Sequence, residues 1–326
     1  MNDLGKWYYN NLLKREGQQF DPINGACFSK DDYSIGLDTD GSETSIMDLH
    51  GIVLKLILEI DRICRKNQID YALGFGSCLG LVNYKGFIPW DDDADIVFKY
   101  EDLDRLIEAF KSDLSEEFTF ECYEINKKYN VLIPTMKLRY KNSYLKEKNH
   151  ITIPNRCGNG DGLFIDICAF VDVPDNKKEH KRTMMLSKFL MPLYCLLDGL
   201  LRIQPYCLKK IIKNHEKRMF KKYHGKTNSV AQTFIIPFQD YKMDITQISC
   251  PRDVIYPFRE YEFEGYKLYS FNNAEEFAKI RYKTSSLKEY KNGKWVDNFP
   301  DEKRRLEHLK NFNLNHSVNK KEKKIK

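Results

Sequence analysis

The sequence predicts an α+β fold in which a mixed β-sheet is flanked by helices. Three short apolar runs, at 71–75, 94–98 and 162–172, are rich in β-branched and aromatic residues, which is typical of buried strands. The segments 45–67 and 101–114 instead carry apolar residues at three- and four-residue spacing, the pattern of amphipathic helices. We therefore expect a core built from both element types.

The remaining segments extend this core. Strand patterns recur at 118–123 and 131–139, a long helical pattern occupies 177–203, and 251–267 reads as a hairpin that turns at Gly265. Helical patterns follow at 273–282 and from residue 300. We divide the chain into an N-terminal extension at 1–44, a core at 45–175, a helical, basic segment at 176–248, a C-terminal part packed on the core at 249–312, and a basic tail at 313–326.

The composition is that of a globular protein. Of 326 residues, 42% are apolar and 31% are charged, which suffices for one large domain or two small ones. Aromatic residues make up 13%, and they either fill the core or form surfaces that bind sugars or cations. The nine cysteines form no Cys-x-x-Cys pair and no secretory leader precedes them, so we expect reduced thiols and a cytoplasmic protein.

Positive charge is concentrated in two places. The segment 202–226 holds nine Lys or Arg against one acid, and the tail 320–326 is also basic. A solvated helix face explains such a segment, and so does peripheral contact with an anionic membrane at its inner face. The preceding window, 184–203, is the most apolar in the chain, but Lys188, Pro192 and Asp198 interrupt it. It is therefore either a buried helix or an interfacial one, and not a membrane span.

Acidic residues cluster at the start of the strand expected at 94–98. Side chains alternate along a strand, so Asp93 and Asp95 share a face and Asp92 points the other way. Two adjacent carboxylates repel each other, and Mg²⁺ or Mn²⁺ is a suitable partner for them. Upstream, Gly76 and Ser77 follow a strand and open a helical segment, where backbone N–H groups can bind a phosphate.

The same stretch resembles a known family. The Gly76-Ser77 step, followed by the run from Lys85 to Asp95, is similar to the signature of the LicD/fukutin family. This resemblance implies a nucleotidyltransferase-like catalytic core at 45–175, and transfer of phosphocholine or a phospho-alditol from a CDP-activated donor to a glycan. Two departures stand out: Asn83-Tyr84 replaces an Arg-His pair, and Lys283 replaces the glycine of an Arg-Tyr-Gly step.

A third acid, Asp166, stands in the middle of an otherwise apolar strand. A buried carboxylate is costly unless it is paired or binds a metal. An ion pair with Lys137 or Arg139 explains it, and so does an exposed strand face. The resemblance favours a third interpretation, because the family carries a similar Ile-Asp-Ile on a later strand. Asp93, Asp95 and Asp166 are thus the predicted catalytic and metal-binding residues.

Further residues are candidates for binding the substrate. Asp91 and Asp92 are suited to ligation through water or to contact with the donor's head group. Trp90 is able to face a quaternary ammonium by a cation–π contact, although a Trp before a strand also serves packing. Candidates for phosphate contacts are Gly76, Ser77, Lys85, Lys137 and Arg139.

The predicted function is metal-dependent transfer of a phospho-substituent, with phosphocholine first, from a CDP-linked donor to a hydroxyl of a cell-surface glycan or its lipid-linked precursor. Alternatives are transfer from a CDP-alditol, an RNA or small-molecule nucleotidyltransferase, and an inactive scaffold; the Lys85–Trp90 run argues against a nucleic-acid substrate. A calcium loop fails, because Ile96 stands where glycine is needed and Asp102 where glutamate is needed.

Overall fold

A computed structural model describes residues 7–8, 10, 35–37, 43–126, 129, 135–141, 143–145, 162–194, 196–197, 206–232, 245–291, 294–297 and 312–313. The helices are α2 (Ile46–Asn67), α3 (Phe75–Tyr84), α4 (Leu103–Asp113), α5 (Lys177–Thr183), α6 (Met185–Tyr194), α7 (Tyr206–Tyr223), α8 (Ile245–Ile248), α9 (Arg252–Ile255) and α10 (Ala274–Tyr282), with a 3₁₀ turn at Tyr100–Asp102. The strands are β1 (Ile35–Leu37), β2 (Glu43–Ser45), β3 (Tyr71–Leu73), β4 (Asp95–Lys99), β5 (Phe118–Glu121), β6 (Thr135–Tyr140), β7 (Tyr144–Leu145), β8 (Phe164–Val173), β9 (Ser229–Gln232), β10 (Ser249–Pro251), β11 (Arg259–Phe263), β12 (Tyr266–Ser270), β13 (Lys288–Lys291), β14 (Lys294–Asp297) and β15 (Phe312–Asn313).

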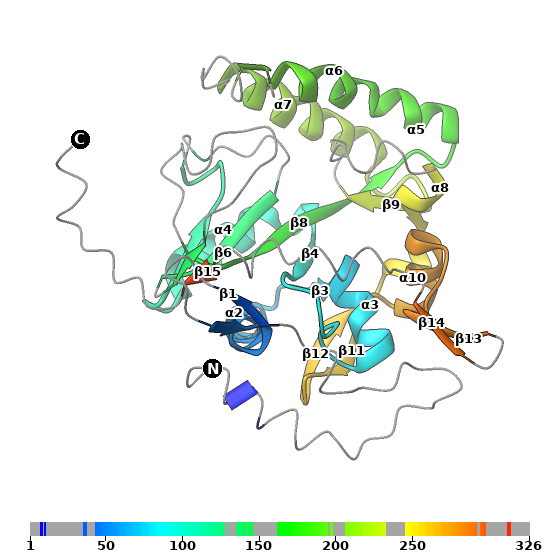
Figure 1. Ribbon diagram of the computed structural model, residues 1–326. Coiled ribbons are helices and arrows are strands. Elements are labelled where there is room, and N and C mark those ends of the chain that lie inside the picture. The colour runs from blue at the N-terminus through cyan, green and yellow to red at the C-terminus, as the bar shows by residue number, and fades with distance from the viewer. Residues whose placement is uncertain are drawn as a thin grey trace.

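A nine-stranded sheet forms the centre of the described chain. Its main path runs β10-β9-β8-β4-β3-β12-β11, and β5 and β6 join it through β8. The pairs β4–β8 and β12–β3 are parallel, whereas the other pairs of this sheet are antiparallel. The mixed sheet flanked by helices that the sequence predicts is therefore confirmed (Figure 1).

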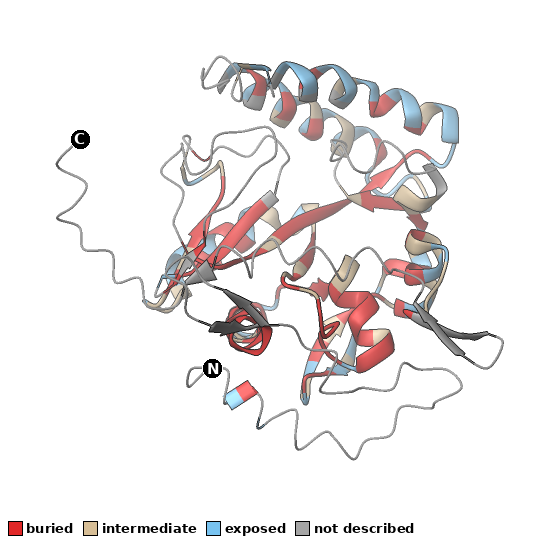
Figure 2. Cartoon of the chain, in the orientation of Figure 1, coloured by how far each residue is buried: buried red, intermediate tan, exposed pale blue. Residues whose placement is uncertain are grey.

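Strand β8 is the longest strand and organises the sheet. One edge of it pairs with β6 over 164–168 and then with β9 over 170–173, while the other edge pairs with β4. Its apolar residues are nearly all buried, because both faces of the strand are covered (Figure 2). The one position of β8 with partial exposure is Asp166.

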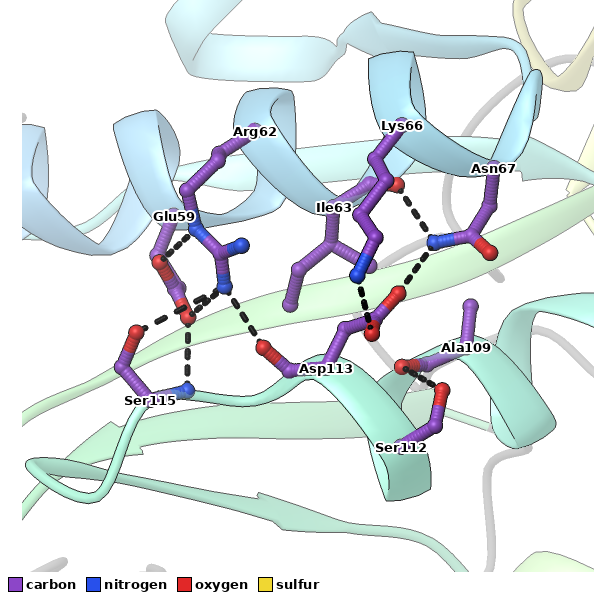
Figure 3. A network of polar contacts seen from close by, with 9 residues as sticks. All are labelled: Glu59, Arg62, Ile63, Lys66, Asn67, Ala109, Ser112, Asp113 and Ser115. Atoms are coloured by element: carbon purple, nitrogen blue, oxygen red, sulfur yellow. Dashed lines mark hydrogen bonds and ion pairs between the residues drawn. The ribbon is translucent and has the colours of Figure 1, made fainter.

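Helix α2 confirms the first predicted helix and packs against β6, β8 and α4. Its polar edge is attached to the end of α4 and the turn that follows (Figure 3). Glu59 accepts hydrogen bonds from Arg62 and from the Ser115 backbone, and Lys66 forms an ion pair with Asp113 at 2.6 Å. These contacts fix the helix that precedes β3, and so fix the start of the site.

Helices α3 and α10 pack against each other, and α3 also contacts β4 and β11. Phe75 of α3 contacts both Phe170 of β8 and Phe277 of α10, with ring centroids 5.8 and 6.1 Å apart. Phe170 has the same strand parity as Asp166, so both side chains point to one face of β8. Consequently α3 and α10 lie beside the face that carries Asp166.

Three sequence predictions need correction. The helix expected at 177–203 is broken at Met184 into α5 and α6, and residues 198–203 lie outside the described chain. The start of the expected hairpin forms the helical turn α9, so the hairpin is β11 and β12 alone. The segment 176–248 also contains a strand, β9, which completes the edge of β8. Most of the N-terminal extension, the helix expected from residue 300 and the basic tail lie outside the described residues.

Candidate active site

The three predicted acids gather where β4 and β8 lie side by side. Asp95 and Asp166 are direct partners in the parallel register of these strands, and the Asp166 N–H donates to the Ala94 carbonyl at 3.1 Å. Asp93 lies two residues before Asp95, in the segment that leads into β4. Asp95 and Asp166 are about seventy residues apart in the sequence, and the pairing of β4 with β8 brings them together. All three carboxylates therefore lie near one another.

The electrostatics of this group are those of crowded negative charge. Burial raises the pKa of Asp95 well above its ordinary value, and the charges of Asp93 and Asp166 raise it further. Arg281 and Lys137 act in the opposite direction and lower the same pKa, without reversing the net shift. The protein thus holds more negative charge at this point than its own cations neutralise.

Lys137 contacts one of the three acids, Asp166, directly. It lies on β6, where Asp166 is its register partner, and its Nζ is 3.1 Å from Asp166 Oδ1. The ammonium also lies 3.1 Å from the centroid of the Phe164 ring, and the side chain is buried. The ion pair that the sequence offered as an explanation of Asp166 is therefore present.

Arg139 lies two residues further along β6 and is engaged elsewhere. Its Nε donates to Glu121 at 2.7 Å and its Nη1 to the Gly162 carbonyl at 3.0 Å. Only 1% of the residue is exposed. These contacts assign Arg139 to holding β5, β6 and the start of β8 together, and its phosphate contact stays a prediction.

The Gly76-Ser77 step lies in the first turn of α3, directly behind β4. The Ser77 hydroxyl accepts a hydrogen bond from the Asp95 N–H at 3.1 Å, and the Gly74 N–H donates to the Asp95 carbonyl at 3.0 Å. Phe75, which follows Gly74 and begins α3, has a φ of 41°, which is unusual for a bulky residue. A Cβ at Gly76 would lie 3.0 Å from the Asp91 carboxylate, so this glycine lies close to the acid run.

The Asp91 carbonyl accepts a hydrogen bond from Nε2 of His50, at 2.6 Å. Because a carbonyl only accepts, this ring nitrogen carries the proton. Burial lowers the pKa of His50 to about 4, so the ring is neutral at pH 7. His50 was not among the predicted residues, and it fixes the backbone at the start of the acid run. Asp92 is buried, whereas Asp91 and Asp93 are partly exposed.

Trp90 and Lys85 occupy different environments. Trp90 is buried with Leu79, Tyr84 and other apolar residues, which matches the packing interpretation of this side chain. Lys85 is exposed and ends α3 in the left-handed conformation, its N–H donating to the Leu81 carbonyl. Its contact with a phosphate stays a prediction.

Arg281 is the functional candidate that the sequence argument did not assign. It comes from the last turn of α10, is buried, and lies over the Phe75 ring at 5.2 Å. Its charge lowers the pKa of Asp95. The feature of the sequence that could have pointed to Arg281 is the Arg281-Tyr282 pair, which resembles the family's Arg-Tyr-Gly step. The glycine of that step corresponds to Lys283, which has a φ of 64°, a conformation that favours glycine.

The other departure from the family pattern has a structural role. Asn83 is buried, donates from its side chain to the Ser285 carbonyl at 2.9 Å and accepts from the Leu287 N–H at 3.0 Å. It therefore attaches α3 to the segment after α10. Within the described residues, Asn83 is turned toward this segment.

The donor chemistry of the acid group fits a divalent cation, since Asp93, Asp95 and Asp166 supply carboxylate oxygens beside an excess of negative charge. Within the described part of the chain, no three His, Cys, Asp or Glu side chains are arranged around a common point as metal ligands. Asp166 faces Lys137 instead. Metal binding therefore remains a prediction of the sequence.

The fold and the site define an α+β domain with acidic residues at neighbouring positions of two adjacent parallel strands. Comparison with known proteins shows that part of this chain is similar to one family. Residues 68–193 match the LicD/FKTN/FKRP nucleotidyltransferase domain, and this range includes all three acids. The resemblance to the LicD/fukutin family is thereby confirmed.

Two curated relatives are similar to part of this chain. The chain is 26% identical over 128 residues to the lipopolysaccharide cholinephosphotransferase LicD of Haemophilus influenzae, covering 39% of this chain and 44% of that protein. It is 32% identical over 103 residues to an uncharacterised protein of Rickettsia prowazekii, covering 29% of this chain and 38% of the relative. The chain thus spans less than half the length of either relative.

Proposed function

We propose that this protein transfers a substituted phosphate, phosphocholine first among the candidates, from a CDP-activated donor to a hydroxyl of a cell-surface glycan or its lipid-linked precursor. The observation that carries the proposal is the pairing of Asp95 with Asp166 in register, inside the region that matches the family domain. The cholinephosphotransferase relative supports the choice of phosphocholine.

In the proposed mechanism, Asp93, Asp95 and Asp166 are the residues that would hold a divalent cation, Mg²⁺ or Mn²⁺. A bound divalent cation neutralises phosphate charge and lowers the pKa of the attacking hydroxyl. Ser77 presents its hydroxyl at the first turn of α3, where N–H groups favour an anion. Lys137 and Arg281 bring positive charge toward the donor phosphates.

Asp166 orients the acceptor hydroxyl. The acceptor oxygen forms a bond to the phosphorus that carries the substituent, while the bond from that phosphorus to CMP breaks. CMP leaves with the electron pair of the broken bond, and the proton of the hydroxyl passes to solvent or to a site carboxylate. We also propose that the reaction takes place in the cytoplasm; the six described cysteines are free thiols, which supports this.

The test is CMP release from a panel of CDP-choline, CDP-ethanolamine, CDP-ribitol and CDP-glycerol, with Mg²⁺ and a glycan acceptor. We expect Asp166→Asn to lower turnover about a hundredfold or more, because it removes a charge from the reacting centre. The matched control is Asp104→Asn, an exposed acid in the first turn of α4, which should leave turnover unchanged.

Full turnover in Asp166→Asn would overturn the assignment of this residue. CMP release from CDP-ribitol or CDP-glycerol alone would replace phosphocholine by an alditol phosphate. Incorporation of a nucleotide into RNA, with no CMP release from any CDP-linked donor, would replace the proposal by the polynucleotide alternative.

A further inference from the structure

Helix α6 carries a row of exposed apolar side chains. Phe189 is 69% exposed, and Met185 and Leu193 are 50% and 41% exposed. Their spacing of four residues places the three side chains along one side of α6. Leu190, which lies away from this row, is buried. The row is thus a continuous apolar stripe on the outer side of α6, defined here as the α6 stripe.

Helix α7 adds positive charge beside α6. Its sequence contains one acid, Glu216, which is buried and lies 3.6 Å from Lys213. Its exposed basic residues are Lys210, Lys217, Arg218, Lys221 and Lys222. Helix α5 contributes further exposed cations before the stripe begins, at Lys177, Lys178, Lys181 and Arg182.

These helices form a layer set against one side of the sheet. Figure 1 shows α5 and α6 running end to end along the rim of the molecule, with α7 next to them, and Figure 2 colours much of these helices pale blue for exposed residues. The inner side is attached to the body, since α7 packs on β8 and Glu179 of α5 pairs with Lys222 at 3.0 Å. The α6 stripe therefore faces outward.

We propose that this layer docks the protein on an anionic lipid bilayer, with the α6 stripe inserted among the acyl chains and the α7 cations near the headgroups. An apolar helix face bordered by Lys and Arg is the pattern of an interfacial helix. Each such cation near an anionic surface strengthens binding. None of the described helices is long and apolar enough to cross a membrane.

Charge favours a bilayer over a second copy of this chain. A two-fold dimer through the stripe would bring each α6 and α7 against the same patch of the partner, and so place Lys188 and the α7 cations near their own copies. Like charges at such an interface oppose association. An anionic bilayer meets the same surface with opposite charge.

The test is sedimentation of the full chain with vesicles of phosphatidylcholine, with and without phosphatidylglycerol. We expect binding to the anionic vesicles and weaker binding as the salt concentration rises. The variant Phe189→Glu/Leu193→Glu should lower the bound fraction to background. The variant Lys217→Glu/Arg218→Glu should weaken the partition coefficient about tenfold or more.

Matched controls come from the opposite side of the molecule in Figure 1. Trp7→Glu changes another exposed apolar residue, and Arg259→Glu/Lys267→Glu reverses an exposed Arg and Lys on the β11–β12 hairpin. Both should bind as the parent does, and unchanged circular dichroism would show that every variant is folded.

Three outcomes would overturn the proposal. The first is no binding to anionic vesicles by the folded parent chain. The second is equal loss in the controls. The third is a parent chain that is a dimer by light scattering and binds no vesicles, together with a monomeric Phe189→Glu/Leu193→Glu variant. The stripe would then be a protein interface.

Discussion

Asp95 is the acid of the site whose charged form is disfavoured by its surroundings. The residue is the register partner of Asp166 and lies two residues after Asp93. Burial and the charges of these two acids raise the pKa of its carboxyl. Lys137 and Arg281 compensate in part. Neighbouring carboxylates in a buried place lower the free energy of unfolding, and such unfavourable arrangements are common in catalytic centres.

This cost predicts the pH dependence of Asp95→Asn. A raised folded-state pKa means that Asp95 favours folding below about 3.8, its ordinary value, and that this contribution is lost as the pH rises through the folded pKa. At pH 7 and without divalent ions, Asp95→Asn should therefore melt higher than the parent, by about 2–4 °C for roughly 1 kcal/mol. The gain should shrink toward acidic pH. Thermal unfolding across pH checks this, and a less stable variant at neutral pH contradicts it.

At single residues, strand parity predicted that Asp93 and Asp95 share a face, whereas the choice of Asp166 as a site residue came from the family resemblance. The structure brings the three residues together, and their roles stay a prediction. The sequence left two basic residues of β6 as possible ion-pair partners of Asp166. In the structure Lys137 is its register partner and forms the ion pair. Arg281 was not predictable from local pattern, because its approach to Asp95 depends on how α10 packs against α3.

The β11–β12 hairpin shows how an element supports the site from outside it. Glu264 and Gly265 both have positive φ, as a tight two-residue turn requires. The Glu264 carboxylate accepts hydrogen bonds from the Phe87 N–H at 2.8 Å and the Tyr8 hydroxyl at 3.0 Å, and its own N–H donates to the Lys85 carbonyl. The turn thus holds the stretch that leads into the acid run.

We predict that Glu264→Ala lowers the free energy of unfolding by about 2 kcal/mol, because it removes the acceptor for buried donors at Phe87 and Tyr8. Glu264→Gln keeps an oxygen at this position and should cost less. The control, Glu262→Ala, changes an exposed acid of the same hairpin and should stay within about 0.5 kcal/mol. Urea unfolding measures all three, and equal losses at 262 and 264 would contradict the role of the turn.

Sequence periodicity was a good guide for elements with one strongly apolar face and a poor one elsewhere. Helix α2 and strand β8 were predicted because burial imposes a clear pattern on them. Strand β9 was missed, since four residues are too short to show alternation and its place is set by pairing with β8. The break at Met184 was also missed, because apolar spacing continues on both sides of it.

On the scale of the whole molecule, β8 connects the two surfaces on which our proposals rest. Its first half carries Asp166 beside β4, and its second half packs against α7 of the proposed docking layer. A single strand therefore fixes the orientation of the acids relative to the α6 stripe. If the layer rests on a bilayer, the acids are held at a constant position relative to that bilayer.

This geometry predicts a difference between acceptors, provided that both proposals hold. Phe189→Glu/Leu193→Glu should lower kcat/KM about tenfold or more for a lipid-linked glycan acceptor in anionic vesicles, because the enzyme no longer concentrates at the surface that carries its substrate. With a water-soluble acceptor the same variant should match the parent, since neither residue lies among the acids, Lys137 or Arg281. CMP release with the two acceptors measures both values. An equal loss with both acceptors would mean that the substitutions disturb the site itself, whereas no loss with either would mean that docking does not contribute to catalysis.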